Sequence, residues 1–428
     1  MSYIHFITKN RDGITTYLLA FIALTIPFSI KLGNLAIIIA ILFNLFFLKK
    51  KNFKTKKGLK FWYLVVFFLI TLVSALSSKN IERGIKHLDL NLLLFLFAII
   101  FLNSKVTKKS IFLVLNALLF GTVISTLVLL IRVLIETNFN GSDFLEFVFH
   151  GFTNFYDQHP VYFSLYLSLS LFYLVLFSKD ILFLLNKECY VICMAVLITG
   201  LIFCASKAVI GFNVVFFFLF YLKKIKSIRK GILFVITFLL LSFFIYKIPF
   251  IENRFNKGLL LSETIINFHP TNDFVNKKLF SYEEKQRISD LEIRYLFLKI
   301  GLYHIYKDNK LFFGYGQGDT EDHLNYQYYS YNLGPNWLQN MNVHNQYLHI
   351  LIMYGSIIFL FFFLYLAYSF FYALTFKNQL HLYFLLLISF VFIFEVVLVR
   401  NKGIVFFYFF NSLFLFGYND FKDSNLRH

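Results

Sequence analysis

The stretch IIFLFFFLYLAYSFFYALTF, residues 357–376, decides the fold class, because it holds no charged residue. A helix needs about 20 apolar residues to cross the roughly 30 Å hydrocarbon core of a bilayer. A second uncharged run, FWYLVVFFLITLVSAL, covers residues 61–76. Inside lipid every backbone N–H and C=O must be bonded within its own element, and neither run alternates polar with apolar residues as a barrel strand does. These runs therefore predict membrane-spanning α-helices.

The composition of the whole chain agrees with this prediction. Of its 428 residues, 58% are hydrophobic and only 15% are charged, which is too apolar for an ordinary soluble domain. The predicted fold class is all-α: a polytopic transmembrane helical bundle of about 12 spans. The predicted spans are residues 14–31, 33–48, 60–77, 87–103, 110–135, 159–177, 189–204, 207–222, 231–250, 346–376, 380–399 and 402–418.

Charged joints between the spans predict the topology. The basic segments 49–60, 103–109 and 223–230 fall on one side of the predicted membrane, and loops rich in Lys and Arg stay in the cytoplasm. Both termini are therefore expected in the cytoplasm. This arrangement accounts for much of the net charge of +18, so no nucleic-acid partner is implied. Three parts follow: helices 1–9 in residues 1–250, a large, partly helical outer loop in 251–345, and helices 10–12 with a short cytoplasmic tail in 346–428.

The polar loop 251–345 is much longer than a usual connection, and long loops of this kind often carry function. Within it LEIRYLFLKIGLYHIYKD, residues 291–308, has the apolar spacing of an amphipathic helix. A glycine-rich turn follows at 311–319, and then a tyrosine-rich stretch at 325–332. The apolar positions of the predicted helix are Ile293, Leu296, Phe297 and Ile300.

Several cations fall at the predicted outer ends of the spans, where short loops are normally poor in them. Arg83 and Lys207, with Arg254 and Arg294 in the outer loop, suit an anionic ligand, because guanidinium and ammonium groups hold phosphate oxygens. The plainer interpretation of each is a snorkelling or surface charge. Glu395 stands five residues before an arginine, too far round a helix for the two to pair on one face, so each has another partner.

Clustered tyrosines in the outer loop suit a saccharide, because its C–H faces pack on rings while its hydroxyls take polar partners. An interfacial aromatic belt is the alternative interpretation of the same residues. A lipid-linked, diphosphate-bearing glycan satisfies both the cations and the tyrosines.

Taken together, the motifs resemble those of the O-antigen ligase and polymerase family of bacterial envelopes, especially its ligase branch. NVHNQYLHILIMYG (342–355) looks like the family's His-Asn motif before an apolar helix, and IRYLFLKIGLYHIYKDNKLFFGYGQGD (293–319) like its Arg-led helix and glycine turn. ASKAVIGF (205–212) is similar to its Ser-Arg turn, although Lys207 replaces the usual arginine and loses bidentate geometry. HPVYFSLYLSLS (159–170) and FEVVLVRNKGIVFFYFF (394–410) look like spans common in ligase-like proteins.

The resemblance implies transfer of a glycan from undecaprenyl diphosphate to lipid A–core at the periplasmic face of the bacterial inner membrane. The transfer is expected to invert the anomeric centre and to need no metal and no cofactor. His344 is the expected general base, and Asn345 either caps the following helix or orients a substrate hydroxyl. Arg294, Lys207 and Arg83, in that order, are the expected ligands of the diphosphate, with Arg254 a further candidate. Without the resemblance, a helix cap would be the preferred interpretation of His344.

Three other functions remain open at this stage. The nearest is a polymerase that joins O-units to one another with the same donor. A ligase that modifies a protein hydroxyl is the next. The third is a transporter of the same lipid-linked glycan, but the chain has neither the inverted repeat nor the paired broken helices typical of transporters.

Overall fold

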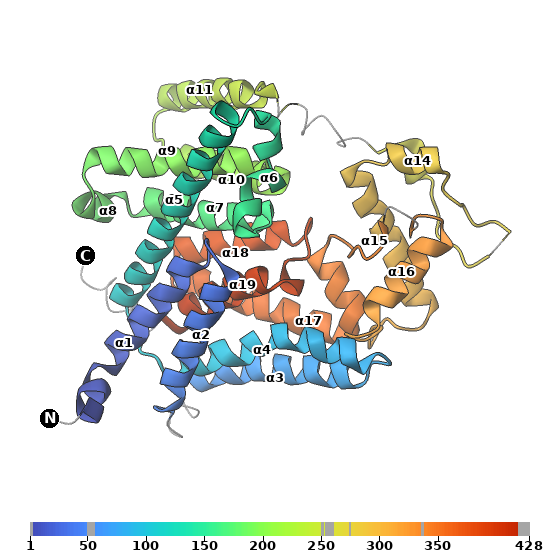
Figure 1. The fold of residues 1–428 in the computed structure, drawn as a ribbon, viewed down its shortest axis with the longest axis horizontal. Helices are drawn as coiled ribbons and strands as arrows, with labels where there is room; N and C mark the ends of the chain where they lie inside the picture. The colour runs from blue at the N-terminus through green and yellow to red at the C-terminus, as the bar shows by residue number, and fades with distance from the viewer. Residues whose placement is uncertain are drawn as a thin grey trace.

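The computed structural model describes residues 3–48, 56–249, 252, 261–273, 275–334 and 338–417. Every regular element in these ranges is helical, and each predicted span overlaps an apolar helix (Figure 1). These are α1 (Tyr3–Thr25), α2 (Ile30–Leu45), α3 (Lys56–Leu76), α4 (Ile81–Asn103), α5 (Lys108–Asn138), α7 (Pro160–Leu176), α9 (Lys187–Cys204), α10 (Lys207–Leu222), α11 (Ile228–Tyr246), α17 (Gln346–Thr375), α18 (Gln379–Val391) and α19 (Asn401–Gly417).

Shorter helices fill the connections. They are η2 (Phe144–Phe147), α6 (His150–Thr153), η3 (Asn154–Tyr156), α8 (Ser178–Leu184), α13 (Glu263–Ile266), α14 (Tyr282–Arg287), α15 (Asp290–Lys307), α16 (Thr320–Ser330) and η5 (Val397–Val399).

The structure is that of a polytopic helical membrane protein. Five of the described helices are long and apolar enough to cross a membrane: α4, α5, α9, α11 and α17. The segment from α6 to α7, which bends by 84°, makes a sixth if it is counted as one span, and α2, α10, α18 and residues 60–76 of α3 are shorter apolar helices. The total of 12 spans therefore stays a prediction.

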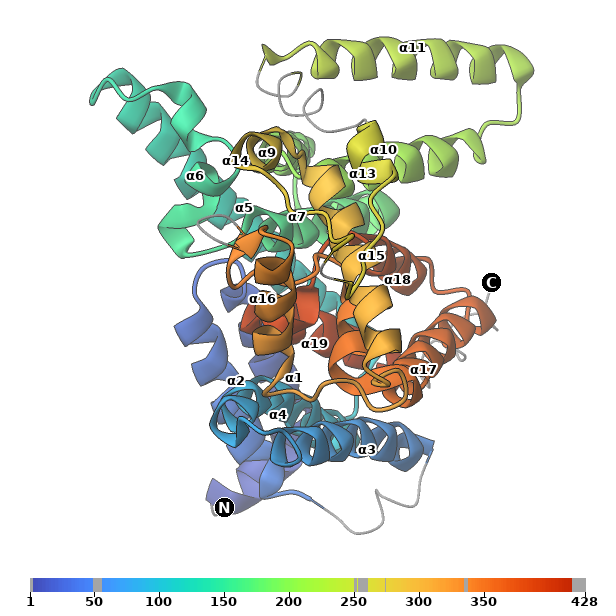
Figure 2. The ribbon, with the colours of Figure 1, turned by 90° about the vertical axis from the view of Figure 1, so that its right-hand side faces the viewer.

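Buried helices form the centre of the bundle. Each described residue of α19 from 402 to 417 is buried, as are residues 160–174 of α7. Hairpin-like pairs surround them, with α3 against α4 and α1 against α5. At the other extreme α11 has no buried residue, and Figure 2 shows it lying apart from the bundle, next to α10. Its apolar surface is therefore available to lipid.

Residues after 261 build a second, outer core beside the bundle. It gathers apolar side chains from α13, α15, α16 and the segments around them. Leu348 and Ile352 of α17 belong to the same core, so the outer subdomain is anchored on the first turns of that helix. The predicted apolar face of α15 is confirmed, since Leu296, Phe297 and Ile300 are completely buried. A capping box between Ser289 and Glu292 begins this helix.

A break in α17 receives the glycine-rich turn of the outer subdomain. Gly355 has φ 81° and ψ 178° inside the helix. The backbone N–H groups of Tyr315 and Gly316 donate to the carbonyls of Ile352 and Met353 at 2.9 Å, and the Ser356 N–H donates 2.8 Å to the Leu311 carbonyl. The turn thus satisfies backbone groups that the break frees.

One predicted span is wrong in its second half. Residues 380–399 were expected to form a continuous helix, but α18 ends at Val391 and residues 392–400 are irregular apart from η5. The Gln346 backbone N–H donates 2.8 Å to the Phe392 carbonyl, and the Gln346 side chain accepts from the Leu398 N–H at 2.6 Å. Contacts with the start of α17 therefore replace helical bonds in this loop.

Candidate functional site

The segment in front of α17 places His344 outside the helix. Asn345 is the N-cap, because its side-chain oxygen accepts from the Leu348 N–H at 2.9 Å. The same side chain donates 3.0 Å to the Ile393 carbonyl in the loop after α18. His344 has φ 48°, and its N–H donates 2.9 Å to the Asn342 side chain. Asn345, and not His344, caps the helix, so the imidazole is left for other contacts.

Glu395 joins His344 to Arg294. One carboxylate oxygen lies 3.3 Å from Nη2 of Arg294 and the other lies 3.5 Å from Nδ1 of His344. The second contact has the length of an ion pair but not the geometry of a hydrogen bond, and within the described residues Nδ1 has no hydrogen-bond partner. The His344 ring also stacks on Phe297 of α15, with centroids 6.0 Å apart and planes at 12°.

The charge of Glu395 follows from its surroundings. Burial alone raises the pKa of this carboxyl, but the contact with His344 and the nearby positive charge of Arg294 outweigh burial and hold the pKa below its ordinary value. The side chain is only 20% exposed. Glu395 is therefore an anion at neutral pH, and an anion beside Nδ1 favours the tautomer that carries its proton there. That tautomer leaves Nε2 of His344 as the basic nitrogen.

Arg294 is held in place by three acceptors. Its Nε donates 3.1 Å to the Phe394 carbonyl, and Nη1 donates 2.7 Å to the Asp290 carbonyl one helical turn earlier in α15. The third acceptor is Glu395. An arginine carries five N–H groups in a planar fork, so two remain for a ligand.

Lys207 reaches the same place from another part of the chain. It opens α10 after the N-cap Ser206, which itself follows a left-handed residue, Ala205, with φ 43°. Its Nζ lies 3.7 Å from the Asp290 carboxylate, and the Asp290 carbonyl is the acceptor of Arg294. The structure thus brings together three predicted site residues. We call Glu395, His344, Arg294, Asp290 and Lys207 the Glu395 cluster.

Arg83 lies elsewhere. It is on the first turn of α4 and forms ion pairs with the first turn of α16, at 2.5 Å to Asp322 and 3.9 Å to Glu321. Among the ion pairs of the described residues, none joins Arg83 to Glu395. Arg254, the remaining predicted cation, lies outside the described residues.

Residues 189–363 match the sequence profile of a family described as O-antigen ligase. The chain carries an O-antigen ligase domain. The match includes Lys207, Arg294 and His344 and ends before Glu395. A comparison with curated proteins finds no match. The chain is thus a helical membrane protein with an O-antigen ligase domain, and this domain implies an enzyme of the ligase and polymerase type that transfers lipid-linked glycans.

Two residues near this site of the O-antigen ligase domain were not predicted as site residues. Glu395 had been noted only as an unusual charge needing a partner, and that charge was the available signal. His159, the N-cap of α7, is close enough for its charge state to respond to both Glu395 and His344. The signal for His159 was its position in the family-like stretch 159–170.

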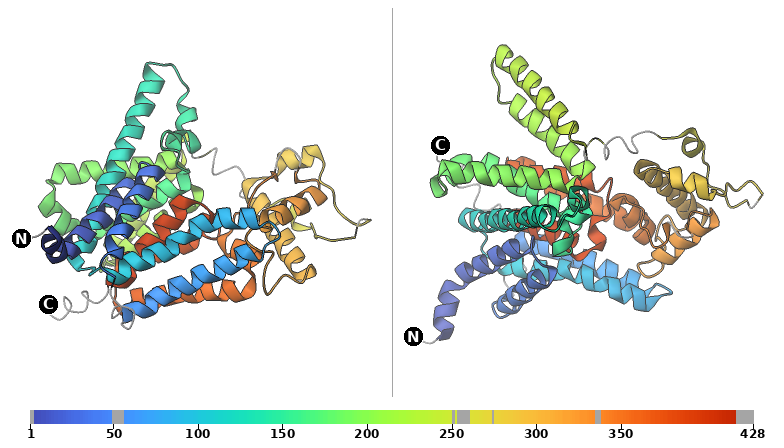
Figure 3. Two further views of the ribbon diagram at one scale, coloured as in Figure 1. Left: turned by 60° about the horizontal axis from the view of Figure 1, so that its bottom comes forward. Right: turned by 45° about the horizontal axis from the view of Figure 1, so that its top comes forward.

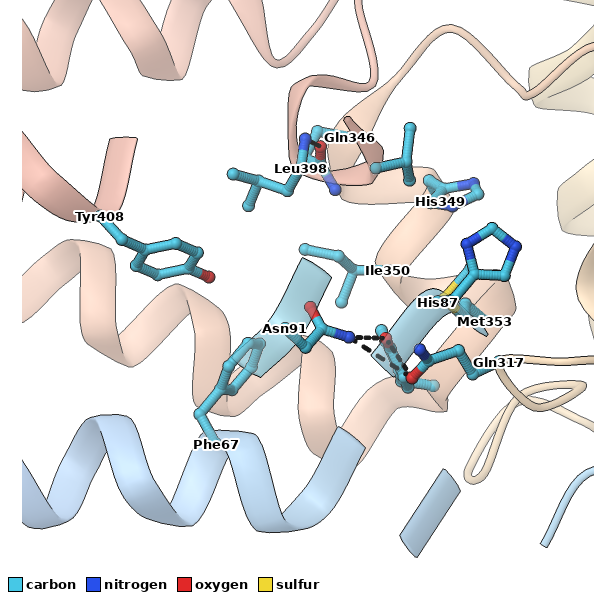
Figure 4. Close-up of a pocket in the computed structure, with 12 residues that line it drawn as sticks. Phe67, His87, Asn91, Gln317, Gln346, His349, Ile350, Met353, Leu398 and Tyr408 are labelled. Atoms are coloured by element: carbon cyan, nitrogen blue, oxygen red, sulfur yellow. Dashed lines mark hydrogen bonds between the residues drawn. The ribbon is translucent and has the colours of Figure 1, made fainter. Parts of the chain in front are cut away.

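A small cavity lies on another face of the first turns of α17 (Figure 4). It has a volume of about 40 Å³, enough for water but not for a sugar. Its lining includes His87, Asn91, Gln317, Gln346 and His349. Neither ring nitrogen of His349 has a hydrogen-bond partner within the described part of the chain. Gln346 connects the cavity to the loop that carries Glu395, through its bond with Leu398.

The chemistry available at the Glu395 cluster is proton transfer beside fixed positive charge. The Glu395 carboxylate adjoins the His344 imidazole. The Arg294 guanidinium and the Lys207 ammonium both contact Asp290, in the first turn of α15. Within the ranges that the structure describes, no group of three or more His, Cys, Asp or Glu side chains is arranged to bind a metal ion.

Proposed function

We propose that the protein transfers a glycan from undecaprenyl diphosphate to lipid A–core at the periplasmic face of the bacterial inner membrane. The observation that carries this proposal is that His344 and Arg294 contact the same carboxylate, that of Glu395. A base for the acceptor hydroxyl thereby adjoins a cation for the leaving diphosphate, and these two groups act within a few bonds of each other in a glycosyl transfer.

The proposed reaction is a single displacement. The acceptor hydroxyl oxygen attacks the anomeric carbon while the bond from that carbon to the diphosphate oxygen breaks, so the configuration inverts. Nε2 of His344 takes the hydroxyl proton, and Glu395 stabilises the imidazolium that forms. The two unused N–H groups of Arg294, with Lys207, hold the charge that grows on the departing diphosphate. Fixed cations thus supply the positive charge that a metal ion would otherwise supply to the leaving diphosphate.

The other predicted residues keep lesser roles in this proposal. Asn345 positions His344 by capping α17 and by holding the loop after α18. Arg83 is the weakest of the three candidates for binding the diphosphate, because it already forms ion pairs with Asp322 and Glu321. Arg254 stays a candidate from its position in the chain alone.

The proposed topology has 12 spans with both termini in the cytoplasm. It divides the chain into helices 1–9 in residues 1–250, a periplasmic segment at 251–345, and helices 10–12 with a cytoplasmic tail at 346–428. The 12 apolar helices in the predicted positions support this count. The three basic joints 49–60, 103–109 and 223–230 then share the cytoplasmic side.

Polymerisation of O-units is the second candidate, since it needs the same donor and the same cluster but a saccharide acceptor on another lipid carrier. Modification of a protein hydroxyl needs only a different acceptor. Transport is the least supported function, because the Glu395 cluster gathers its charge at one end of the bundle and not along a path through it.

A deletion strain tests the proposal. It is complemented with wild type, His344→Ala or His269→Ala, the last being a control at an exposed histidine of the same outer segment. We expect the deletion to leave bare core on lipopolysaccharide gels while long glycan accumulates on the lipid carrier. Wild type and His269→Ala restore the ladder at equal protein levels, and His344→Ala does not. A core with one repeat identifies a polymerase, and full rescue by His344→Ala refutes the mechanism.

A further inference from the structure

A groove lies on the outer surface where the turn between α3 and α4 meets the outer subdomain. Its volume of about 730 Å³ falls within the roughly 300–1,000 Å³ typical of small-molecule sites. The turn between α3 and α4 supplies Lys79, the first turn of α4 supplies Glu82, and the subdomain supplies Lys310, Asp319, His323 and Tyr326. Figure 3 shows the ends of α3 and α4 reaching this part of the subdomain.

The two walls of the groove are firmly joined. The Asp319 carboxylate accepts from the backbone N–H groups of Lys79 and Asn80 at 2.7 and 2.8 Å. The Gly318 N–H donates 2.9 Å to the Ser78 hydroxyl, and a side chain at Gly318 would lie 2.1 Å from the Asn80 carbonyl oxygen. Because segments about 240 positions apart meet this closely, the groove has a defined shape.

Ring faces and neutral donors line the groove. Tyr326 is 70% exposed, and Tyr315 and His323 pack with ring centroids 3.9 Å apart. Burial lowers the pKa of His323, so its imidazole is neutral at pH 7 and offers one hydrogen-bond donor and one acceptor.

The charges of the groove do not select a phosphate. Asp319 is used by two backbone N–H groups, and Asp322 pairs with Arg83. The remaining charges of the lining are two ammonium groups, of Lys79 and Lys310, and the carboxylate of Glu82. Such a mixture of separated charges, neutral donors and ring faces fits a ligand that is rich in hydroxyl groups and also has apolar C–H faces.

We propose that this groove binds saccharide units of the glycan beyond the sugar that reacts. The inference rests on the proposed function and adds a subsite to it. Tyr328, on the other face of α16 from Tyr326, packs on Phe297, which stacks on His344. The groove is therefore separated from His344 by the thickness of α16, about 10 Å, and by the packed rings of Tyr328 and Phe297, whose centroids lie 4.6 Å apart, with that of Phe297 6.0 Å from the His344 ring. A glycan of several sugars spans that distance, and it comes either from the donor or from the acceptor.

Binding of free oligosaccharide tests the subsite without requiring transfer. The probes are two lipid-free glycans from the native strain: the one released by mild acid from the lipid carrier, and the core oligosaccharide of its lipopolysaccharide. Each is titrated against the full-length protein in nanodiscs, in a His344→Ala background that cannot transfer under the proposed function. We expect one probe to bind, and Tyr326→Ala or Lys310→Ala to weaken its binding roughly tenfold.

The control is Tyr306→Ala, which removes a tyrosine of α15 that is 72% exposed but does not line the groove; it should bind as its parent does. Binding of the carrier-derived glycan assigns the groove to the donor, and binding of the core assigns it to the acceptor. The subsite is wrong if neither probe binds, or if Tyr326→Ala binds as tightly as Tyr306→Ala. If the probes bind but His344→Ala still transfers glycan in cells, the mechanism fails and the subsite stands.

Discussion

Replacing Glu395 by glutamine tests the central contact of the proposed mechanism. The carboxylate lies 3.5 Å from Nδ1 of His344, and two unit charges at that distance interact by ~5 kcal/mol at an effective dielectric constant of about 20. If about half a charge has formed on the imidazole at the transition state, Glu395 stabilises it by ~2.4 kcal/mol. Loss of that stabilisation slows transfer ~50-fold.

Membranes from the deletion strain supply the assay, since they retain the accumulated lipid-linked glycan. Initial transfer rates are compared for wild type, Glu395→Gln and Glu283→Gln, which neutralises an exposed carboxylate of α14. Glu283→Gln should keep the wild-type rate. Because the pKa of Glu395 is held below its ordinary value, the carboxylate is charged at neutral pH, where the rates are compared.

One result would contradict this reasoning. A Glu395→Gln rate within about threefold of wild type at equal protein level, a difference of under ~1 kcal/mol, means that the carboxylate does not stabilise charge on His344.

Three further predictions concern stability and binding. Gly355→Ala should destabilise the protein by ~1–3 kcal/mol or more in thermal unfolding, because φ is 81° and the new Cβ would lie 2.1 Å from the Phe312 carbonyl oxygen. The control Gly211→Ala should leave the stability unchanged, because the new Cβ would have no atom within 4 Å. Burial lowers the pKa of His304 to about 4, so between about pH 6.5 and pH 4 the unfolded chain binds a proton at this residue and the folded chain does not. The free energy of unfolding should therefore fall as the pH is lowered from about 6.5 towards 4, and His304→Gln should flatten that dependence. Arg294→Lys keeps the charge but offers three N–H groups in place of five, so transfer should fall more than ~tenfold, with a raised KM for the lipid-linked donor; an unchanged KM would contradict it.

Local sequence patterns were enough for most of the fold. Uncharged runs predicted the long helices, and the spacing of Leu296, Phe297 and Ile300 predicted the buried face of α15. A charge between two apolar runs marked Lys207, the family-like Arg-led helix marked Arg294, and the structure brings both to the Glu395 cluster. These features are local, because hydrophobicity and helical periodicity act over a few turns.

Contacts between distant segments could not be predicted in this way. Glu395 was assigned to a helix because its neighbours are apolar, but α18 ends four residues earlier and the carboxylate turns to Arg294, 101 positions away. Arg83 was expected beside the diphosphate, but the carboxylates of α16 that pair with it are about 240 positions away. Gly355 in an apolar run reads as an ordinary helical residue until the turn at 311–316 is known to fill the break.

The broken α17 also constrains how the protein is made. Its break exposes the carbonyls of Ile352 and Met353, which in lipid alone would lack partners. The N–H groups that satisfy them belong to residues 315 and 316, which leave the ribosome before α17 does. In the proposed topology this turn is already crossing to the outer side when the helix enters the membrane. The donors of these hydrogen bonds are therefore synthesised before their acceptors. If the two segments were exchanged along the chain, the carbonyls at the break would enter the membrane without hydrogen-bond partners.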